Sequence, residues 1–227
     1  MQTVQRSSMG RLARRIVWTV AWMALGLLSV QFLLEVYAKY HETAAETYDM
    51  FLSRRGWLWT HLAGGTITIV LGPLQFLSRW PRVYPRLHRW AGRVYLLGML
   101  IAATGATGLI ATSPAPMEIR TAFAATQLAW LSTALIALVA IYRGQVTVHR
   151  RWMSRHYLVT LSPISFRMLL PASIAIGLVP APTLIATLLL LSWALPLLLI
   201  DGVFRSLELV RKPALAEARG AGNAAAI

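Results

Sequence analysis

Apolar residues in this chain occur in blocks of about twenty, and this block length constrains the fold more than any other feature. Twenty residues of α-helix extend about 30 Å, which matches the hydrocarbon core of a bilayer. The blocks predict six transmembrane helices, at residues 15–38, 57–78, 92–112, 121–142, 156–178 and 183–204. The sequence therefore predicts an all-α, polytopic membrane helix bundle. It forms a single domain over residues 1–212, followed by a disordered tail at 213–227.

The composition supports a membrane protein and excludes several kinds of chemistry. Only 13% of the residues are charged, whereas a soluble domain has about a quarter. The chain has no cysteine, so disulfides, thiolate metal sites and cysteine nucleophiles are excluded. The Arg-flanked apolar run at 11–38 is too long for the core of a signal peptide and is interpreted as a retained first helix.

The positions of the basic residues predict the orientation of the bundle. With both termini in the cytoplasm, four basic residues fall in outer segments and one, Arg167, falls inside a helix. The inner segments hold the other seventeen: Arg6, Arg11, Arg14, Arg15, Arg79, Arg82, Arg86, Arg89, Arg93, Arg143, Arg150, Arg151, Arg155, Arg205, Arg211, Lys212 and Arg219. Lys and Arg are enriched on the cytoplasmic side of membrane proteins, so we expect a multi-pass protein of a bacterial inner membrane. The net charge of +14 is attributed to this inner collar, with anionic lipid head groups rather than nucleic acid as its partners.

Small and polar residues form stripes on two of the predicted helices. On helix 57–78 the stripe recurs at spacings of three and four, which places it on one face: His61, Gly65, Thr68, Gly72 and Gln75. Helix 92–112 carries a similar stripe of Gly98, Ala102, Gly105 and Gly108. Small residues let membrane helices approach closely, so these two helices are predicted to pack as an antiparallel hairpin.

Arg167 is the most unusual residue, because it lies eleven residues into helix 156–178, about 16 Å from its inner end. A charge at that depth is costly and marks a functional site by default. One interpretation is structural: Arg167 pairs with Glu35 or binds carbonyls freed near Pro163 and Pro171. The other is a ligand with anionic or carbonyl oxygens, such as a quinone, a propionate or a lipid phosphate. The same helical face carries His156, Thr160 and Pro163.

The histidines are the second group of candidates. His88, His149 and His156 lie at the predicted inner interface, and His61 lies one turn inside the outer one. Imidazoles at one level are suited to a metal ion or, as a pair, to the axial positions of a b-type haem. His149 and His156 are seven residues apart, so one ion does not easily bind both on a straight helix. The alternative is that these histidines contact lipid phosphates, helix ends or neighbouring helices.

A short internal echo accompanies these residues. His88-Arg89-Trp90 and His149-Arg150-Arg151-Trp152 each precede an outward-going helix. The echo is either the remnant of a repeated two-helix unit or a coincidence in an Arg-rich chain.

Four blocks of residues together resemble a known family. They are His61 with its Gly-rich helix, Gly72-Pro73-x-Gln75-Phe76, His88-Arg89-x-x-Gly92-Arg93-x-Tyr95 and His149-Arg150-Arg151-Trp152-Met153-x-Arg155. Their order and spacing resemble the predicted bacterial membrane proteins called domain of unknown function 2306, over residues 57–170. The resemblance implies a multi-helix inner-membrane protein with an arginine in the fifth helix, where Arg167 stands. It implies no established activity.

These observations lead to one working hypothesis, a ligand site within the bundle that binds a redox cofactor or a small molecule. Quinone and b-type haem are the two candidate ligands, and the cofactor is otherwise unknown. The candidate binding residues are His61, Gln75, His88, Arg93, His149, Arg150, His156 and Arg167. The alternative is a non-catalytic subunit of a larger membrane complex. A transporter is less favoured because carboxylates are scarce in the predicted helices. The sequence does not decide whether the protein is an enzyme, and it predicts no catalytic residue.

Overall fold

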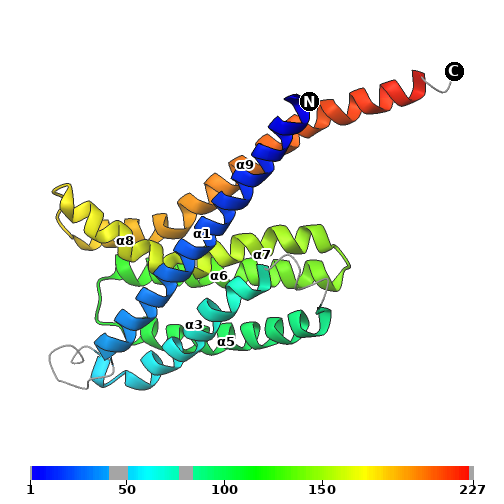
Figure 1. The fold of residues 1–227 in the computed structure, drawn as a ribbon. Helices are drawn as coiled ribbons and strands as arrows, with labels where there is room; N and C mark the ends of the chain where they lie inside the picture. The colour runs from blue at the N-terminus through cyan, green and yellow to red at the C-terminus, as the bar shows by residue number, and fades with distance from the viewer. Residues whose placement is uncertain (1, 41–50, 77–83, 225–227) are drawn as a thin grey trace. The chain divides into compact units, whose positions relative to one another are not determined.

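The computed structural model describes residues 2–40, 51–76 and 84–224, and all seven long helices in these ranges are α-helices (Figure 1). They are α1 (Gln2–Tyr40), α3 (Arg55–Phe76), α5 (Pro85–Ala111), α6 (Met117–Tyr142), α7 (Val146–Thr160), α8 (Ser162–Ala175) and α9 (Pro182–Ala224). The described residues contain no β-strand, so the predicted all-α class is confirmed for them. The inner loop with Arg79 and Arg82 lies outside the described residues.

The chain divides into two compact units, residues 1–115 and 116–227. Four helices in the described ranges are long and apolar enough to cross a membrane by themselves: α1 from Arg15, α5, α6 and α9 as far as Gly202. The pair α7–α8 meets the same criteria when it is taken as one bent span. Four or five candidate spans are therefore observed. The six crossings, the side of the termini and the single domain stay predictions.

The first unit is built on a tight antiparallel hairpin of α3 and α5, as the stripes of small residues predict (Figure 1). A Cβ atom added to Gly105 would collide with the backbone of Trp57 and His61, near the start of α3. Gln75, near the end of α3, lies against Gly92, near the start of α5. The two helices are thus in contact along almost their whole length.

The prediction that Gly65 belongs to the contact stripe of α3 is wrong. A Cβ on Gly65 would meet nothing within 4 Å, whereas a Cβ on Gly64 would collide with the backbone at Gly98 and Ala102. Gly64 therefore takes the place that was predicted for Gly65. Thr68 and Gly72 are buried as expected.

The C-terminal end of α1 packs on the start of α3, where Val36 and Tyr40 form a small core with Leu58. Arg54, one of the four basic residues that the sequence places in outer segments, is buried with 7% of its surface exposed. It donates a hydrogen bond of 3.3 Å to the Leu109 carbonyl, at the C-terminal end of α5. A cation at a helix C-terminus is favourable because the last carbonyl groups there carry partial negative charge.

The second unit packs α6 against α7 and α9, and α8 against α9. Alanines 134, 137 and 140 of α6 are buried, and their small side chains permit close approach of the neighbouring helices. Where α8 meets α6 and α9, Phe166 packs on a core of Ala122, Ala186 and Leu189. Trp193 of α9 donates a hydrogen bond of 3.0 Å to the Thr126 hydroxyl of α6.

Two boundaries in the second unit differ from the prediction. The segment predicted as an inner loop before residue 156 is helical from Val146. The single helix predicted over 156–178 is instead interrupted by a bend of 46° between α7 and α8. Pro163 explains the bend, because it has no N–H to donate to the Val159 carbonyl and it disfavours helical geometry at the preceding residue.

In the first unit, α5 begins at Pro85 rather than at residue 92, with proline in its first turn.

The last helix, α9, extends to Ala224 and so includes most of the residues for which a disordered tail is predicted. The side chains near the end of α9 lie outside the described residues, and the tail stays a prediction.

Candidate functional site

The histidine at the centre of the second unit is His156, whose side chain is completely buried. Its Nδ1 lies 3.1 Å from the Trp130 carbonyl and 3.3 Å from the Thr133 hydroxyl. Because a carbonyl oxygen can only accept, Nδ1 carries the proton and donates. The imidazole also stacks on the indole ring of Trp130, with ring centroids 6.0 Å apart and planes 12° apart.

The neighbours of His156 are themselves hydrogen-bonded. The Trp130 indole N–H donates to the Thr160 hydroxyl at 2.8 Å, and that hydroxyl donates to the His156 carbonyl at 3.0 Å. The Thr133 hydroxyl donates to the Ala129 carbonyl at 2.7 Å. This network holds α6 and α7 together. Its members Trp130, Thr133 and Thr160 were not predicted as site residues, although all three are polar positions inside apolar helices.

His149 stands in the first turn of α7 and is half-buried. Its Nδ1 lies 2.8 Å from the carbonyl of Ala137 in α6, so Nδ1 again carries the proton. In the neutral imidazole this leaves the lone pair on Nε2, and no described residue forms a hydrogen bond with that atom. The neighbouring Arg150 is exposed.

His61 in α3 is held in the same manner, with Nδ1 3.0 Å from the carbonyl of Ala102 in α5. A backbone carbonyl on Nδ1 is the usual arrangement by which proteins orient a histidine whose Nε2 binds a metal or another ligand. His61 and His149 thus share one tautomer and present Nε2 away from the helix that fixes them.

The remaining candidates of the first unit lie at the other end of the hairpin from His61. His88 is half-buried in the first turn of α5, and Arg93 is exposed, with its guanidinium 5.4 Å from the ring centre of Trp90. The amide oxygen of Gln75 lies near Gly92, and its buried Nε2 has no hydrogen-bond partner among the described residues. His61 bonds to Ala102, fourteen residues along α5 from His88, which is about 21 Å of helix.

Arg167 lies in α8, six residues beyond the bend, and is half-buried. His149 lies near the opposite end of α7, eleven residues before Thr160, which is about 16 Å of helix. These two candidates therefore do not line one small pocket. The bend also interrupts the helical face that was predicted to carry both His156 and Arg167. Glu35, the alternative partner of Arg167, accepts a hydrogen bond of 3.0 Å from Gln31.

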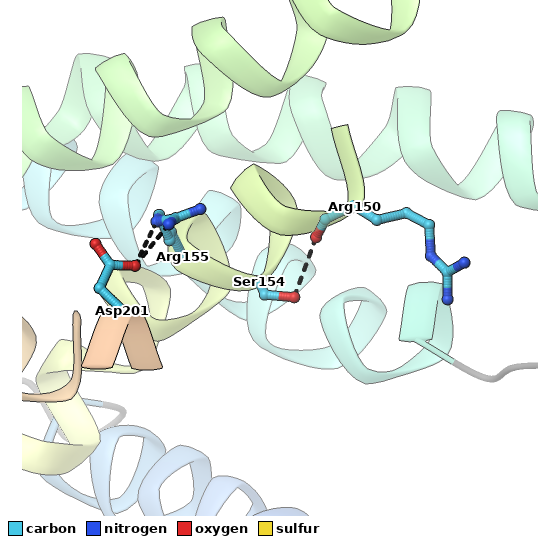
Figure 2. A network of polar contacts seen from close by, with 4 residues as sticks. All are labelled: Arg150, Ser154, Arg155 and Asp201. Carbon is cyan, nitrogen blue, oxygen red and sulfur yellow. Dashed lines mark hydrogen bonds and ion pairs between the residues drawn. The ribbon is translucent and has the colours of Figure 1, made fainter. Parts of the chain in front are cut away.

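A further polar contact in the second unit was not predicted. Arg155 of α7 places Nε 2.9 Å and Nη2 2.6 Å from the Oδ1 atom of Asp201 in α9 (Figure 2). The Arg155 guanidinium also lies 5.0 Å from the ring centre of Trp152. Among the described residues, no three His, Asp or Glu side chains come together in a way that could hold a metal ion.

The described helices and their apolar surfaces define a class, the multi-pass integral membrane proteins. Comparison with family models gives a match over residues 58–203 to domain of unknown function 2306 (DUF2306), described as a predicted membrane protein. The match covers more than half of the chain, so the chain belongs to this family. No curated protein and no solved structure gives a match.

Proposed function

We propose that this integral membrane protein binds a quinol at His149. The observation that supports the proposal is the 2.8 Å contact between His149 Nδ1 and the Ala137 carbonyl. Because this contact fixes the proton on Nδ1, Nε2 is a hydrogen-bond acceptor with a set direction. A quinol hydroxyl is a donor that matches it. The exposed Arg150 beside His149 supplies a positive charge that favours oxygen ligands.

Within each unit, the positions of the histidines favour a quinol over a b-type haem with two axial histidines. Such a haem needs two imidazoles that face each other across the iron. In the second unit, His149 and His156 lie two turns apart on one helix, and His156 Nδ1 is committed to α6. In the first unit, His61 and His88 lie near opposite ends of the α3–α5 hairpin. A quinol needs only one oriented imidazole.

The test measures binding of a short-chain ubiquinol to the full-length protein in detergent, by titration calorimetry. In the His149→Asn variant the amide nitrogen replaces Nδ1 and still reaches the Ala137 carbonyl, while the acceptor at Nε2 is lost. We expect binding to weaken about five- to tenfold, the value of about one hydrogen bond. Ser154→Ala on the same helix removes only a local bond to the Arg150 carbonyl and is the matched control.

Two results would contradict the proposal. The first is an absence of quinol binding to the unmodified protein, and the second is equal binding to His149→Asn and Ser154→Ala. An absorption spectrum before and after dithionite accompanies the titration. A reduced α-band typical of b-type haem would show that the ligand is haem rather than a quinol. Loss of that band in His149→Asn would then identify His149 as a ligand of the haem iron.

A second candidate function is that of a non-catalytic subunit in a membrane complex, and the surface of α1 favours it. Only 6% of the apolar span of α1 is buried, against 22–39% for α5, α6 and α9. An apolar helix with so little cover faces lipid or another protein. Co-purification of a second chain in stoichiometric amount under mild detergent would support this function, and a monodisperse single chain would argue against it.

A further inference from the structure

The same eight-residue pattern occurs once in each unit of the chain. Residues 89–96 read Arg-Trp-Ala-Gly-Arg-Val-Tyr-Leu and residues 151–158 read Arg-Trp-Met-Ser-Arg-His-Tyr-Leu. Five of the eight positions are identical, at a constant separation of 62 residues. This separation is one residue longer than that between His88 and His149, which begin the two His-Arg echoes.

The structure gives the matching residues matching surroundings. Tyr95 and Tyr157 are both buried, with 1% and 5% of their surfaces exposed. In both copies the arginine lies over the tryptophan that precedes it by one helical turn: Arg93 is 5.4 Å from Trp90, and Arg155 is 5.0 Å from Trp152. Each copy also lies on a helix that packs antiparallel to the long helix before it, near the start of α5 in the first copy and over the middle and end of α7 in the second. The two segments are therefore structural equivalents.

The copies differ in what the arginine binds. Arg155 is neutralised by Asp201, whose Oδ1 accepts a hydrogen bond from Nε and forms an ion pair with Nη2 (Figure 2). Among the described residues no carboxylate pairs with Arg93, and the sequence contains no Asp or Glu between Asp49 and Glu118. The Arg93 guanidinium is held in the same manner on its indole ring, and no described residue of the unit places a carboxylate against it.

The surface around Arg93 has the properties of a membrane interface. Arg86, Arg89 and Arg93 are spaced by three and four residues and are all exposed, so they form one basic stripe on α5. A shallow, open hollow lies at the start of this stripe and is lined, among the described residues, by Tyr84, Pro85, Arg86 and Leu87. Tyr84 and Trp90 are 61% and 62% exposed, as expected for aromatic side chains at the head-group level.

We propose that Arg93, with Arg86 and Arg89, binds the phosphate of an anionic phospholipid, which occupies the place that Asp201 takes in the other copy. A guanidinium stacked on an indole presents its N–H groups at the ring edge, and a phosphate accepts two of them as a carboxylate does. The hollow beside Arg86 receives the rest of the head group. This site is in the first unit and is independent of the quinol proposed at His149.

The test is native mass spectrometry of the full-length protein, titrated with phosphatidylglycerol or with phosphatidylcholine. We expect one tightly retained phosphatidylglycerol and a preference for it over phosphatidylcholine. Arg93→Gln should weaken its retention about fivefold, the effect of one charge near the membrane surface. Arg93→Lys keeps the charge and loses the two-pronged geometry, so an intermediate value is expected. Arg143→Gln, at an exposed arginine after α6, is the control and should change little.

Three outcomes would overturn the proposal. If Arg93→Gln and Arg143→Gln weakened the retention of phosphatidylglycerol equally, the lipid would be held by general charge attraction rather than at a specific site. Equal retention of the two lipids by the unmodified protein would remove the anionic specificity. Displacement of phosphatidylglycerol by millimolar inorganic phosphate would identify free phosphate as the ligand. Unchanged thermal unfolding of Arg93→Gln verifies that the variant is folded, and Arg93→Lys provides a second measurement if it is not.

Discussion

Arg155 and Asp201 link α7 to α9 by a hydrogen bond from Nε and an ion pair from Nη2 to one carboxylate oxygen (Figure 2). The Arg155 side chain is 18% exposed and that of Asp201 is 40% exposed, so solvent screens the pair in part. We expect Asp201→Asn and Arg155→Met each to lower the free energy of unfolding by about 1 kcal/mol. SDS titration in mixed micelles measures this free energy.

The control for this pair is Arg150→Met. Figure 2 shows the Arg150 side chain extending away from Arg155 and Asp201. The hydrogen bond drawn to Arg150 is the one that its main-chain carbonyl accepts from the Ser154 hydroxyl. The double variant Arg155→Met/Asp201→Asn should lower the free energy of unfolding by less than the sum of the two single decreases, because each single variant already breaks the same contact. Additive losses, or losses no larger than that of Arg150→Met, would show that the pair does not stabilise the fold.

The sequence indicated the histidines of the candidate site but not what holds them. His61, His149 and His156 all donate from Nδ1 to a backbone carbonyl on a neighbouring helix. Every residue has a carbonyl, so no residue type at Ala102, Ala137 or Trp130 signals the partner. Arg155 and Asp201 escaped prediction for a related reason. They are 46 residues apart, and their pairing depends on how α7 and α9 pack.

At the scale of an element, the α3–α5 hairpin distinguishes two adjacent glycines. A methyl group on Gly64 would collide with backbone atoms of Gly98 and Ala102, which cannot rotate away as a side chain can. The same group on Gly65 would meet nothing within 4 Å. We expect Gly64→Ala to destabilise the protein by about 1–3 kcal/mol through overpacking. Gly65→Ala should be neutral or stabilising by up to about 1 kcal/mol, through helix propensity.

The two glycine variants are compared in the same SDS titration, and each serves as the other's control. Equal effects of Gly64→Ala and Gly65→Ala would contradict the close approach of α3 and α5 at Gly64. A larger loss in Gly65→Ala would instead support the register that the sequence stripe predicted, with Gly65 at the contact.

The helices show how far periodicity can predict such a fold. Spacings of three and four residues correctly predicted that α3 and α5 pack by small residues, but they fit Gly64 and Gly65 almost equally well. The bend between α7 and α8 was not predicted, although Pro163 is visible in the sequence. Proline is common inside straight membrane helices, and whether it bends one depends on the partners that satisfy the freed backbone groups.

At the scale of the whole molecule, the number of membrane crossings depends on α3, which is not among the helices that are apolar enough to span by themselves. The residues that lower its hydropathy include His61, Gly64 and Gln75, and all three contact α5 rather than the outer surface. Hydropathy averaged along the sequence counts them as if lipid surrounded them. The 22 residues of α3 extend about 33 Å, and they run antiparallel to the candidate span α5 over almost its length.

We therefore expect α3 to cross the membrane together with α5. Single cysteines at Gly56, before the contact region of α3, and at Tyr84, before α5, test this in intact cells with a membrane-impermeant maleimide. Both positions are exposed, and the chain has no cysteine of its own, so every signal comes from the introduced residue. Gly56→Cys should be labelled from outside and Tyr84→Cys only after permeabilisation, because basic residues near α5 favour the cytoplasmic side. Ser113→Cys, beyond the other end of α5, is the control and should behave as Gly56→Cys does. If Gly56→Cys and Tyr84→Cys were labelled from the same side, α3 would not cross and the six-span topology would be wrong.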